Sequence, residues 1–286
     1  MIDPNRLKKI ELVVFDLDGT LLNEYAEIGE KSIELVSELK KNGVRFTFAT
    51  GRLHNSMVEF AKILDLQIPL ISLDGAIIKS YPANEIIFES YIKPKYVKKA
   101  VDMADDLLLK VALSHDEAIF YTEQNSLIPR LMDKYEAKFE EIDSYDNLMD
   151  KTLEIVITGD YKNSIKLIED KMKFPSAFGL KTSFYKSQDQ DGVYFLEIRN
   201  KNCSKGDGLL KLVKHLKINI INTAVIGDWY NDKSLFKTNA LKIAVANAVD
   251  EIKKMSDFIT TKTNEEDGTA EFLEMILRAK NGKNAE

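Results

Sequence analysis

The stretch LVVFDLDGTLL, residues 12–22, decides the fold of this 286-residue chain. Its first four residues are apolar, as in a buried strand, and two acids, Asp16 and Asp18, follow directly. Gly19 permits the tight turn that stops the chain from continuing the strand. Both carboxylates can therefore face one site at the strand's carboxyl end.

Two further apolar runs also stop at polar residues. FTFA, residues 46–49, leads to Thr50 in TGR, and TAVIG, residues 223–227, leads to Asp228 in GDWYND. Ligands of open α/β sheets bind beyond the carboxyl ends of the strands, where side chains from distant segments can converge. Together with Lys205 of SKGD, these residues could assemble a complete site for moving a phosphoryl group.

Hydrophobic periodicity predicts alternating strands and helices at both ends of the chain. The expected N-terminal elements are strand Ile10–Phe15, helix Glu30–Lys41, strand Val44–Ala49, helix Asn55–Leu66 and strand Leu70–Leu73. The expected C-terminal elements are helix Gly208–Leu216, strand Thr223–Ile226, helix Lys233–Lys237, strand Ile243–Val245 and helix Gly268–Ala279. This alternation favours an α/β protein with a Rossmann-like parallel-sheet core, built from residues 1–82 and 195–286.

The middle of the chain, residues 83–194, carries its own mixture of elements. We expect strands near Ile86–Ile92, Val111–Leu113, Ile119–Thr122, Glu154–Thr158 and Thr182–Lys186, and helices near Tyr96–Leu109, Leu127–Tyr135 and Ser164–Met172. That content is sufficient for an independent α+β domain inserted into the core through two short connections.

The composition is that of a soluble globular protein, with 44% hydrophobic and 30% charged residues. A net charge of -6 without a Lys/Arg-rich stripe argues against a nucleic-acid partner, and no apolar run approaches the roughly 18 residues of a membrane helix. Cys203 is the single cysteine, and the N-terminus lacks a signal-peptide pattern. We therefore expect a cytoplasmic protein. We also expect either a monomer or a weak homodimer.

The polar residues at the strand ends suit phosphate chemistry. An aspartate can form an aspartyl-phosphate, while a neighbouring carboxyl exchanges protons with the leaving group and water. Carboxylates repel a phosphate dianion, so the site needs a cation, and Mg²⁺ prefers oxygen ligands such as those of Asp228 and Asp232. Thr50 and Gly51, at a strand-to-helix transition, offer a hydroxyl and backbone amides to phosphate oxygens. The three histidines show no ligand spacing, and one cysteine cannot build a zinc site.

The motifs DLDGTLL, TGR, SKGDGL and GDWYND, in this order, resemble the four motifs of the haloacid dehalogenase-like hydrolase superfamily. The long insertion between Arg52 and Lys205 resembles the Cof-type (class IIB) phosphatases, which carry an α/β cap domain. Asp74-Gly75 departs from the pattern, because many relatives have Asn-Gly there, and it predicts an altered substrate polarity. Lys242 stands where a small residue is common.

The resemblance implies a role for each matching residue. Asp16 would attack phosphorus, and Asp18 would protonate the leaving oxygen and then activate water. The resemblance assigns the remaining residues to phosphate and metal binding: Thr50, Gly51, Lys205 and Asn231 to phosphate, and Asp16, the backbone carbonyl of Asp18, Asp228 and Asp232 to Mg²⁺. Asp232 could be either a metal ligand or an outer-shell support, and Asn231 could position phosphate or Asp228.

The implied function is Mg²⁺-dependent hydrolysis of phosphate monoesters of small metabolites, such as sugar phosphates, with the inserted domain closing over the substrate. One alternative is a phosphomutase or phosphotransferase, which would pass the same phosphoryl group to a second hydroxyl. Another is a non-catalytic protein that binds a phosphorylated metabolite. The intact acid pair argues against this last alternative, because mutually repelling carboxylates are costly without a metal or a reaction.

Overall fold

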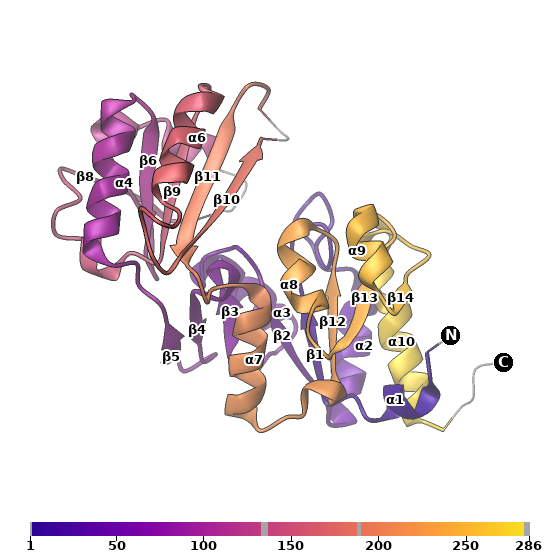
Figure 1. The fold of residues 1–286 in the computed structure, drawn as a ribbon. Helices are drawn as coiled ribbons and strands as arrows, with labels where there is room; N and C mark the ends of the chain where they lie inside the picture. Colours follow the sequence, from indigo (N-terminus) through magenta and orange to yellow (C-terminus); the bar gives the residue numbers. More distant parts are fainter. Residues whose placement is uncertain (1, 133–136, 188–189, 283–286) are drawn as a thin grey trace. The chain divides into compact units, whose positions relative to one another are not determined.

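The computed structural model describes residues 2–132, 137–187 and 190–282, and the chain divides into two compact units. The first unit comprises Met1–Gly51, Met57–Ile87 and Ser204–Glu286, and the second comprises Arg52–Ser56 and Phe88–Cys203. Both ends of the sequence, indigo and yellow in Figure 1, therefore belong to one unit that the second interrupts.

The first unit is built on a parallel sheet of five strands, which confirms the predicted α/β class with a parallel-sheet core. In spatial order the strands are β14 (Phe258–Ile259), β13 (Leu241–Ala244), β12 (Thr223–Gly227), β1 (Leu12–Phe15) and β2 (Arg45–Phe48). The central strands β1 and β12 are buried at every residue. Continuous apolar runs are typical of parallel strands, because helices cover both of their faces.

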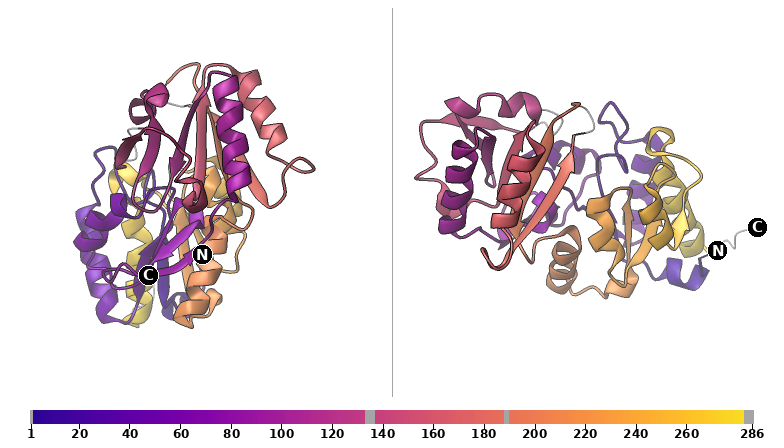
Figure 2. Two further views of the ribbon diagram at one scale, coloured as in Figure 1. Left: turned by 90° about the vertical axis from the view of Figure 1, so that its left-hand side faces the viewer. Right: turned by 45° about the horizontal axis from the view of Figure 1, so that its top comes forward.

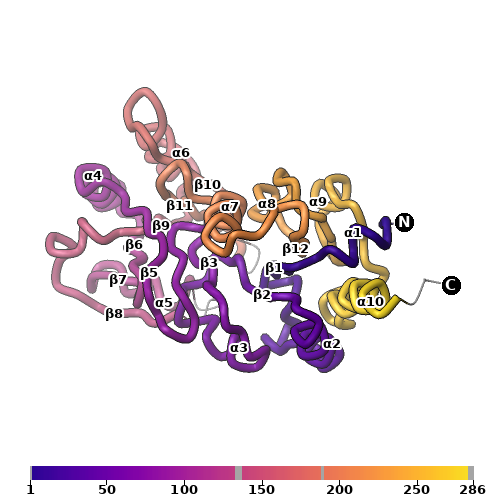
Figure 3. Tube along the Cα trace, turned by 90° about the horizontal axis from the view of Figure 1, so that it is seen from below, coloured from indigo at the N-terminus to yellow at the C-terminus, as the bar shows by residue number. Residues whose placement is uncertain are grey.

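Helices cover the two faces of this sheet, as Figure 3 shows from below. One face carries α2 (Glu30–Lys41) and α10 (Gly268–Lys280), and the other carries α7 (Lys205–Leu216), α8 (Lys233–Phe236) and α9 (Asp250–Met255). Val36 and Leu39 of α2 are buried, as the helical spacing of Ile33, Val36 and Leu39 predicts, whereas Ile33 is half-buried and Leu35 is buried as well. The short α1 (Pro4–Lys8) packs on α10.

The segment after β2 differs from the prediction in two places. The expected helix Asn55–Leu66 is a 3₁₀ turn, Asn55–Met57, followed by α3 (Val58–Ile63). The expected third strand, β3 (Leu70–Ser72), belongs to a separate sheet with β4 (Ile77–Lys79) and β5 (Ile86–Glu89).

A reversal of the chain explains the position of β3. Leu73 and Asp74 both have positive φ, which turns the chain back so that β4 pairs antiparallel with β3. A single parallel bridge between Ala49 and Ile71 connects β3 to the end of β2. The strand thus extends the parallel sheet at one residue pair only.

The second unit is an α+β arrangement around a six-stranded, mainly antiparallel sheet. Its strands, in spatial order, are β10 (Leu180–Lys186), β11 (Tyr194–Asn200), β9 (Glu154–Gly159), β6 (Lys110–Ser114), β7 (Ile119–Thr122) and β8 (Phe139–Ile142). The helices α4 (Pro94–Asp106) and α6 (Lys162–Lys171) lie side by side on one face, as Figure 2 shows. Alternate residues of β6, β9 and β11 pack against them in one apolar core.

The boundaries of the second unit lie beyond those expected at residues 83 and 194. Tyr194 begins β11, which pairs with β10 along its whole length and with β9 from Tyr194 to Ile198, and the unit continues to Cys203. The expected helix Leu127–Tyr135 is observed as α5 (Ile128–Leu131), and its last three residues, 133–135, lie outside the described residues. Among the described helices, none combines the length and the apolar character that crossing a membrane requires.

Candidate active site

The predicted site residues of the first unit follow three strands whose carboxyl ends are aligned. Phe15 of β1 is in register with Phe48 of β2 and Ile226 of β12. Because all three strands are parallel, the residues that follow them emerge at one edge of the sheet. Asp16 and Asp228 are two of these residues, and both are buried.

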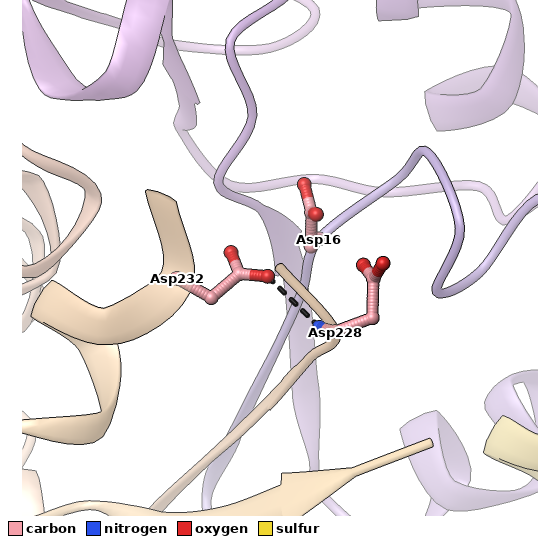
Figure 4. Close-up of side chains that lie close together, drawn as sticks. All are labelled: Asp16, Asp228 and Asp232. Carbon is pink, nitrogen blue, oxygen red and sulfur yellow. Dashed lines mark hydrogen bonds between the residues drawn. The ribbon is translucent and has the colours of Figure 1, made fainter. Parts of the chain in front are cut away.

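Three carboxyl groups gather at this edge. Asp16, Asp228 and Asp232 each offer a carboxylate oxygen, and these oxygens all lie within 4.8 Å of one another (Figure 4). Asp16 follows β1, Asp228 follows β12, and Asp232 lies in the short turn before α8. The cluster therefore joins segments that are more than 200 residues apart in the sequence, as the motifs predicted.

Lys205 supplies one positive charge to this cluster. Its Nζ lies 2.6 Å from Asp16 Oδ1 and 2.7 Å from Asp232 Oδ1, and its side chain is fully buried. It is the first residue of α7, whose N-cap Ser204 accepts a hydrogen bond from the backbone N–H of Asp207. Burial lowers the pKa of Lys205, whereas the charges of the adjacent Asp16 and Asp232 raise it. The rise is larger than the fall, so the pKa of Lys205 lies above its ordinary value.

Asp232 has protein donors on both of its carboxylate oxygens. Oδ1 accepts the bond from Lys205, whereas Oδ2 accepts hydrogen bonds from the backbone N–H groups of Asp228 at 2.9 Å and Trp229 at 3.1 Å. The carboxylate thus fixes both the ammonium group and the loop that carries Asp228. This geometry fits an outer-shell support better than a direct metal ligand.

Asp228 is held by a residue that sequence reasoning missed. The Thr20 hydroxyl donates a hydrogen bond of 2.6 Å to Asp228 Oδ1, across 208 residues of sequence. The sequence did place this hydroxyl next to the site, since Thr20 directly follows the turn glycine of DLDGT. No property of a single sequence, however, identifies the partner of such a hydroxyl.

The acidic cluster carries more negative charge than the protein neutralises. Burial, and then the charge of Asp232, raise the pKa of Asp228 to about 7, although Thr20 and Lys205 oppose this rise. Burial and Asp232 also raise the pKa of Asp16 well above its usual range, against the opposing effect of Lys205. Three carboxyl groups facing one ammonium group, with oxygen donors only, fit a hard divalent cation.

Asp18 and Gly19 pass close to this cluster. Asp18 is exposed to solvent, and its charge contributes to the raised pKa of Asp228. Gly19 has φ +76°, and a Cβ at this position would lie 2.7 Å from Asp228 Oδ2. The turn after Asp18 can therefore follow this path only with glycine.

The residues expected to bind phosphate form a second group around Asp74. Thr50 is buried, and its carbonyl accepts a hydrogen bond of 2.9 Å from the backbone N–H of Asp74. Asn231 is exposed, and its Nδ2 donates to Asp74 Oδ1 over 3.4 Å. A Cβ on Gly51 would lie 3.6 Å from the same oxygen. Lys205, by contrast, contacts the acidic cluster directly.

Comparisons with known proteins identify the class to which this fold and site belong. A sequence model of haloacid dehalogenase-like hydrolases matches residues 13–273, so the chain belongs to this family. It is an enzyme, a phosphoric monoester hydrolase, and hydrolases of this family generally use a divalent metal ion.

Individual relatives match almost the whole chain at low identity. The phosphatase YwpJ of Bacillus subtilis is 25% identical over 94% of this chain and 100% of its own length. The 5-amino-6-(5-phospho-D-ribitylamino)uracil phosphatase YwtE of the same organism is 27% identical over 94% of this chain and 98% of its own. A haloacid dehalogenase-like hydrolase from Bacteroides thetaiotaomicron has a similar structure, with a TM-score of 0.81 and 25% identity over 93% of this chain and 99% of that one.

Proposed function

We propose that the chain releases inorganic phosphate from phosphate monoesters of small metabolites, sugar phosphates in particular, through an aspartyl-phosphate and with Mg²⁺. The observation that carries this proposal is the buried contact of Lys205 with Asp16, beside Asp228 at the end of the sheet. The ammonium group opposes the rise in the pKa of Asp16 that burial and Asp232 cause, and in this way it favours the ionised, nucleophilic form. A relative at 27% identity, whose name gives a phospho-D-ribityl compound, supports a polyol or sugar phosphate.

The reaction has two steps in which the acids exchange roles. An Asp16 oxygen attacks phosphorus, the bond from phosphorus to the ester oxygen breaks, and Asp18 gives its proton to that oxygen. Asp18 then takes a proton from water as the water oxygen attacks phosphorus, and the bond to Asp16 breaks. Phosphate leaves, and both aspartates return to their starting states.

Four further residues would hold the transferred group. The charge of Lys205 and the donors of Thr50, Gly51 and Asn231 would face the phosphoryl oxygens, over which negative charge spreads during transfer. Thr50 and Gly51 follow the end of β2, Lys205 begins α7, and Asn231 lies in the turn before α8.

The oxygen donors of the acidic cluster fit Mg²⁺. Asp16, the backbone carbonyl of Asp18 and Asp228 would hold the ion, and Asp232 would support them, since both of its oxygens accept bonds from protein donors. Bound Mg²⁺ would supply positive charge that offsets the repulsion between these carboxylates and the phosphate. The inserted domain, predicted at residues 83–194, would act as a cap that selects the leaving group.

A screen of phosphate release from sugar phosphates, nucleotides and pyridoxal phosphate, with and without Mg²⁺, tests the proposal. We expect Asp16→Asn to abolish release while the protein stays folded. Mg²⁺-dependent release by a rigorously purified Asp16→Asn protein would contradict the assignment of the nucleophile. An isomeric sugar phosphate as product would favour a mutase, and tight metabolite binding without turnover would favour a non-catalytic binding protein.

A further inference from the structure

Two consecutive residues after β3 adopt a backbone conformation that is unusual for them. Leu73 has φ +45°, and Asp74 has φ +49° with ψ +38°, so both lie in the left-handed region. Such residues cost on the order of 1–3 kcal/mol each, and they persist where the surrounding structure holds them, often at functional sites. The turn at Leu73–Gly75 therefore needs an explanation beyond chain reversal.

The surroundings hold this turn between two of the segments that the proposed function uses. The backbone N–H of Asp74 donates to the carbonyl of Thr50 over 2.9 Å. Gly75 packs against the start of α7 so closely that a Cβ would lie 2.3 Å from the carbonyl oxygen of Ser204. The turn is thus fixed to the end of β2 on one side and to the residue before Lys205 on the other.

The carboxylate of Asp74 lies among groups that the proposed function assigns to phosphate. Its Oδ1 accepts a hydrogen bond from Asn231 Nδ2 at 3.4 Å and lies 3.6 Å from the Cβ position of Gly51. Asp74 is 9% exposed, so solvent screens its charge weakly. The charge of Asp74 also acts on Lys205. Burial lowers the pKa of Lys205, whereas the charges of Asp16, Asp232 and then Asp74 raise it.

We infer that Asp74 is a specificity-determining residue that weakens the binding of phosphate anions at this site, so that inorganic phosphate is a poor inhibitor. The inference rests on the proposed function. A fixed carboxylate repels an anion held by neighbouring donors, and it accepts the Asn231 amide hydrogen that a phosphate oxygen would otherwise accept. The strained turn keeps the carboxylate at this position.

The test compares two variants that remove the charge and still accept the left-handed conformation. Asn and Gly both adopt positive φ readily, so Asp74→Asn and Asp74→Gly should fold. We expect the inhibition constant of inorganic phosphate to fall on the order of tenfold in both variants, because one repulsive interaction at short range is lost. Asp250→Asn, an exposed position in the first turn of α9, removes the same charge elsewhere and should leave the constant unchanged.

The outcomes separate this inference from the proposed function. Suppose that the wild type releases phosphate and that either Asp74 variant has both the thermal midpoint and the phosphate inhibition constant of the wild type. Only the inference about Asp74 is then wrong. Tighter phosphate binding in Asp74→Asn alone would assign the effect to the new amide donor and would likewise overturn it. If the wild-type protein neither releases nor binds phosphate, both the inference and the proposed function fail.

Discussion

Lys205 Nζ lies 2.6 Å from Asp16 Oδ1, and the two side chains are 0% and 5% exposed. Removing one partner of such a buried pair leaves an uncompensated charge, which typically costs about 3–5 kcal/mol. We therefore expect Lys205→Met to lower the free energy of unfolding by about this amount at pH 8 and to abolish phosphate release. Urea unfolding, monitored in the presence of a chelator, measures the first effect.

Lys233→Met is the matched control for this prediction. Lys233 pairs with Glu251, but these side chains are 39% and 43% exposed, so solvent screens the pair. We expect a loss below about 1 kcal/mol and retained activity. Equal losses in the two variants would show that the Lys205 pair stabilises the fold no more than a surface pair does.

Stability should depend on pH through the acidic cluster. The pKa of Asp228 is raised to about 7 and that of Asp16 well above its usual range, whereas an unfolded aspartate titrates near 3.9. Between these values the folded protein binds more protons than the unfolded chain, so the metal-free protein loses stability as pH rises from about 4 through about 7. Mg²⁺ should replace these protons, and the thermal shift that it produces should grow from pH 5 to pH 8.

Thermal unfolding with Mg²⁺ or with a chelator, followed across this pH range, measures the dependence. Asp228→Asn removes one titrating carboxyl and should flatten the difference between the two curves. A larger stabilisation by Mg²⁺ at pH 5 than at pH 8 would contradict the proposed competition between protons and metal.

Trp229 offers a direct signal for metal binding. It is the only tryptophan of the chain, it follows Asp228, and its backbone N–H donates to Asp232 Oδ2. We expect Mg²⁺ to change its fluorescence with a saturable dependence on concentration, and Asp228→Asn to weaken the apparent affinity at least about tenfold. A wild-type signal that does not respond to Mg²⁺, together with an unchanged thermal midpoint, would argue against a metal site at these residues.

The parallel core could be predicted because its sequence signals are local. Buried parallel strands are continuous apolar runs, and α2 has the bounds that its periodicity predicts, Glu30–Lys41. The displacement of β3 could not be predicted, because it depends on positive φ at Leu73 and Asp74, which are not glycines. β8 and β11 were missed for a similar reason, since their half-buried strands depend on neighbours distant in sequence.

The candidate site likewise combines residues that the sequence predicts with contacts that it does not predict. The motif order predicted which residues meet, and Asp16, Lys205, Asp228 and Asp232 do lie together. The bonds within the group depend on geometry that the sequence does not carry. That Asp232 accepts two backbone N–H groups follows from the course of the loop, and sequence reasoning therefore left its role open.

Two glycines with nearly equal φ angles provide a final test of the site. Gly19 has φ +76° and Gly43 has φ +79°, so replacement by alanine imposes a similar strain, about 1–2 kcal/mol, at either position. A Cβ at Gly43 meets nothing within 4 Å, whereas one at Gly19 would lie 2.7 Å from Asp228 Oδ2. Gly19→Ala must therefore displace the Asp228 carboxylate in addition to straining the chain.

We expect both alanine variants to lose stability in urea, Gly19→Ala by more because it also displaces a buried carboxylate, and only Gly19→Ala to lose function. Its kcat/KM should fall at least about tenfold, as is common when a group next to a metal ligand is disturbed, and the Mg²⁺ concentration for half-maximal activity should rise. Gly43→Ala should retain the wild-type values of both. If Gly19→Ala retains them as well, the position of the Asp228 carboxylate in the fold is not the position that catalysis requires.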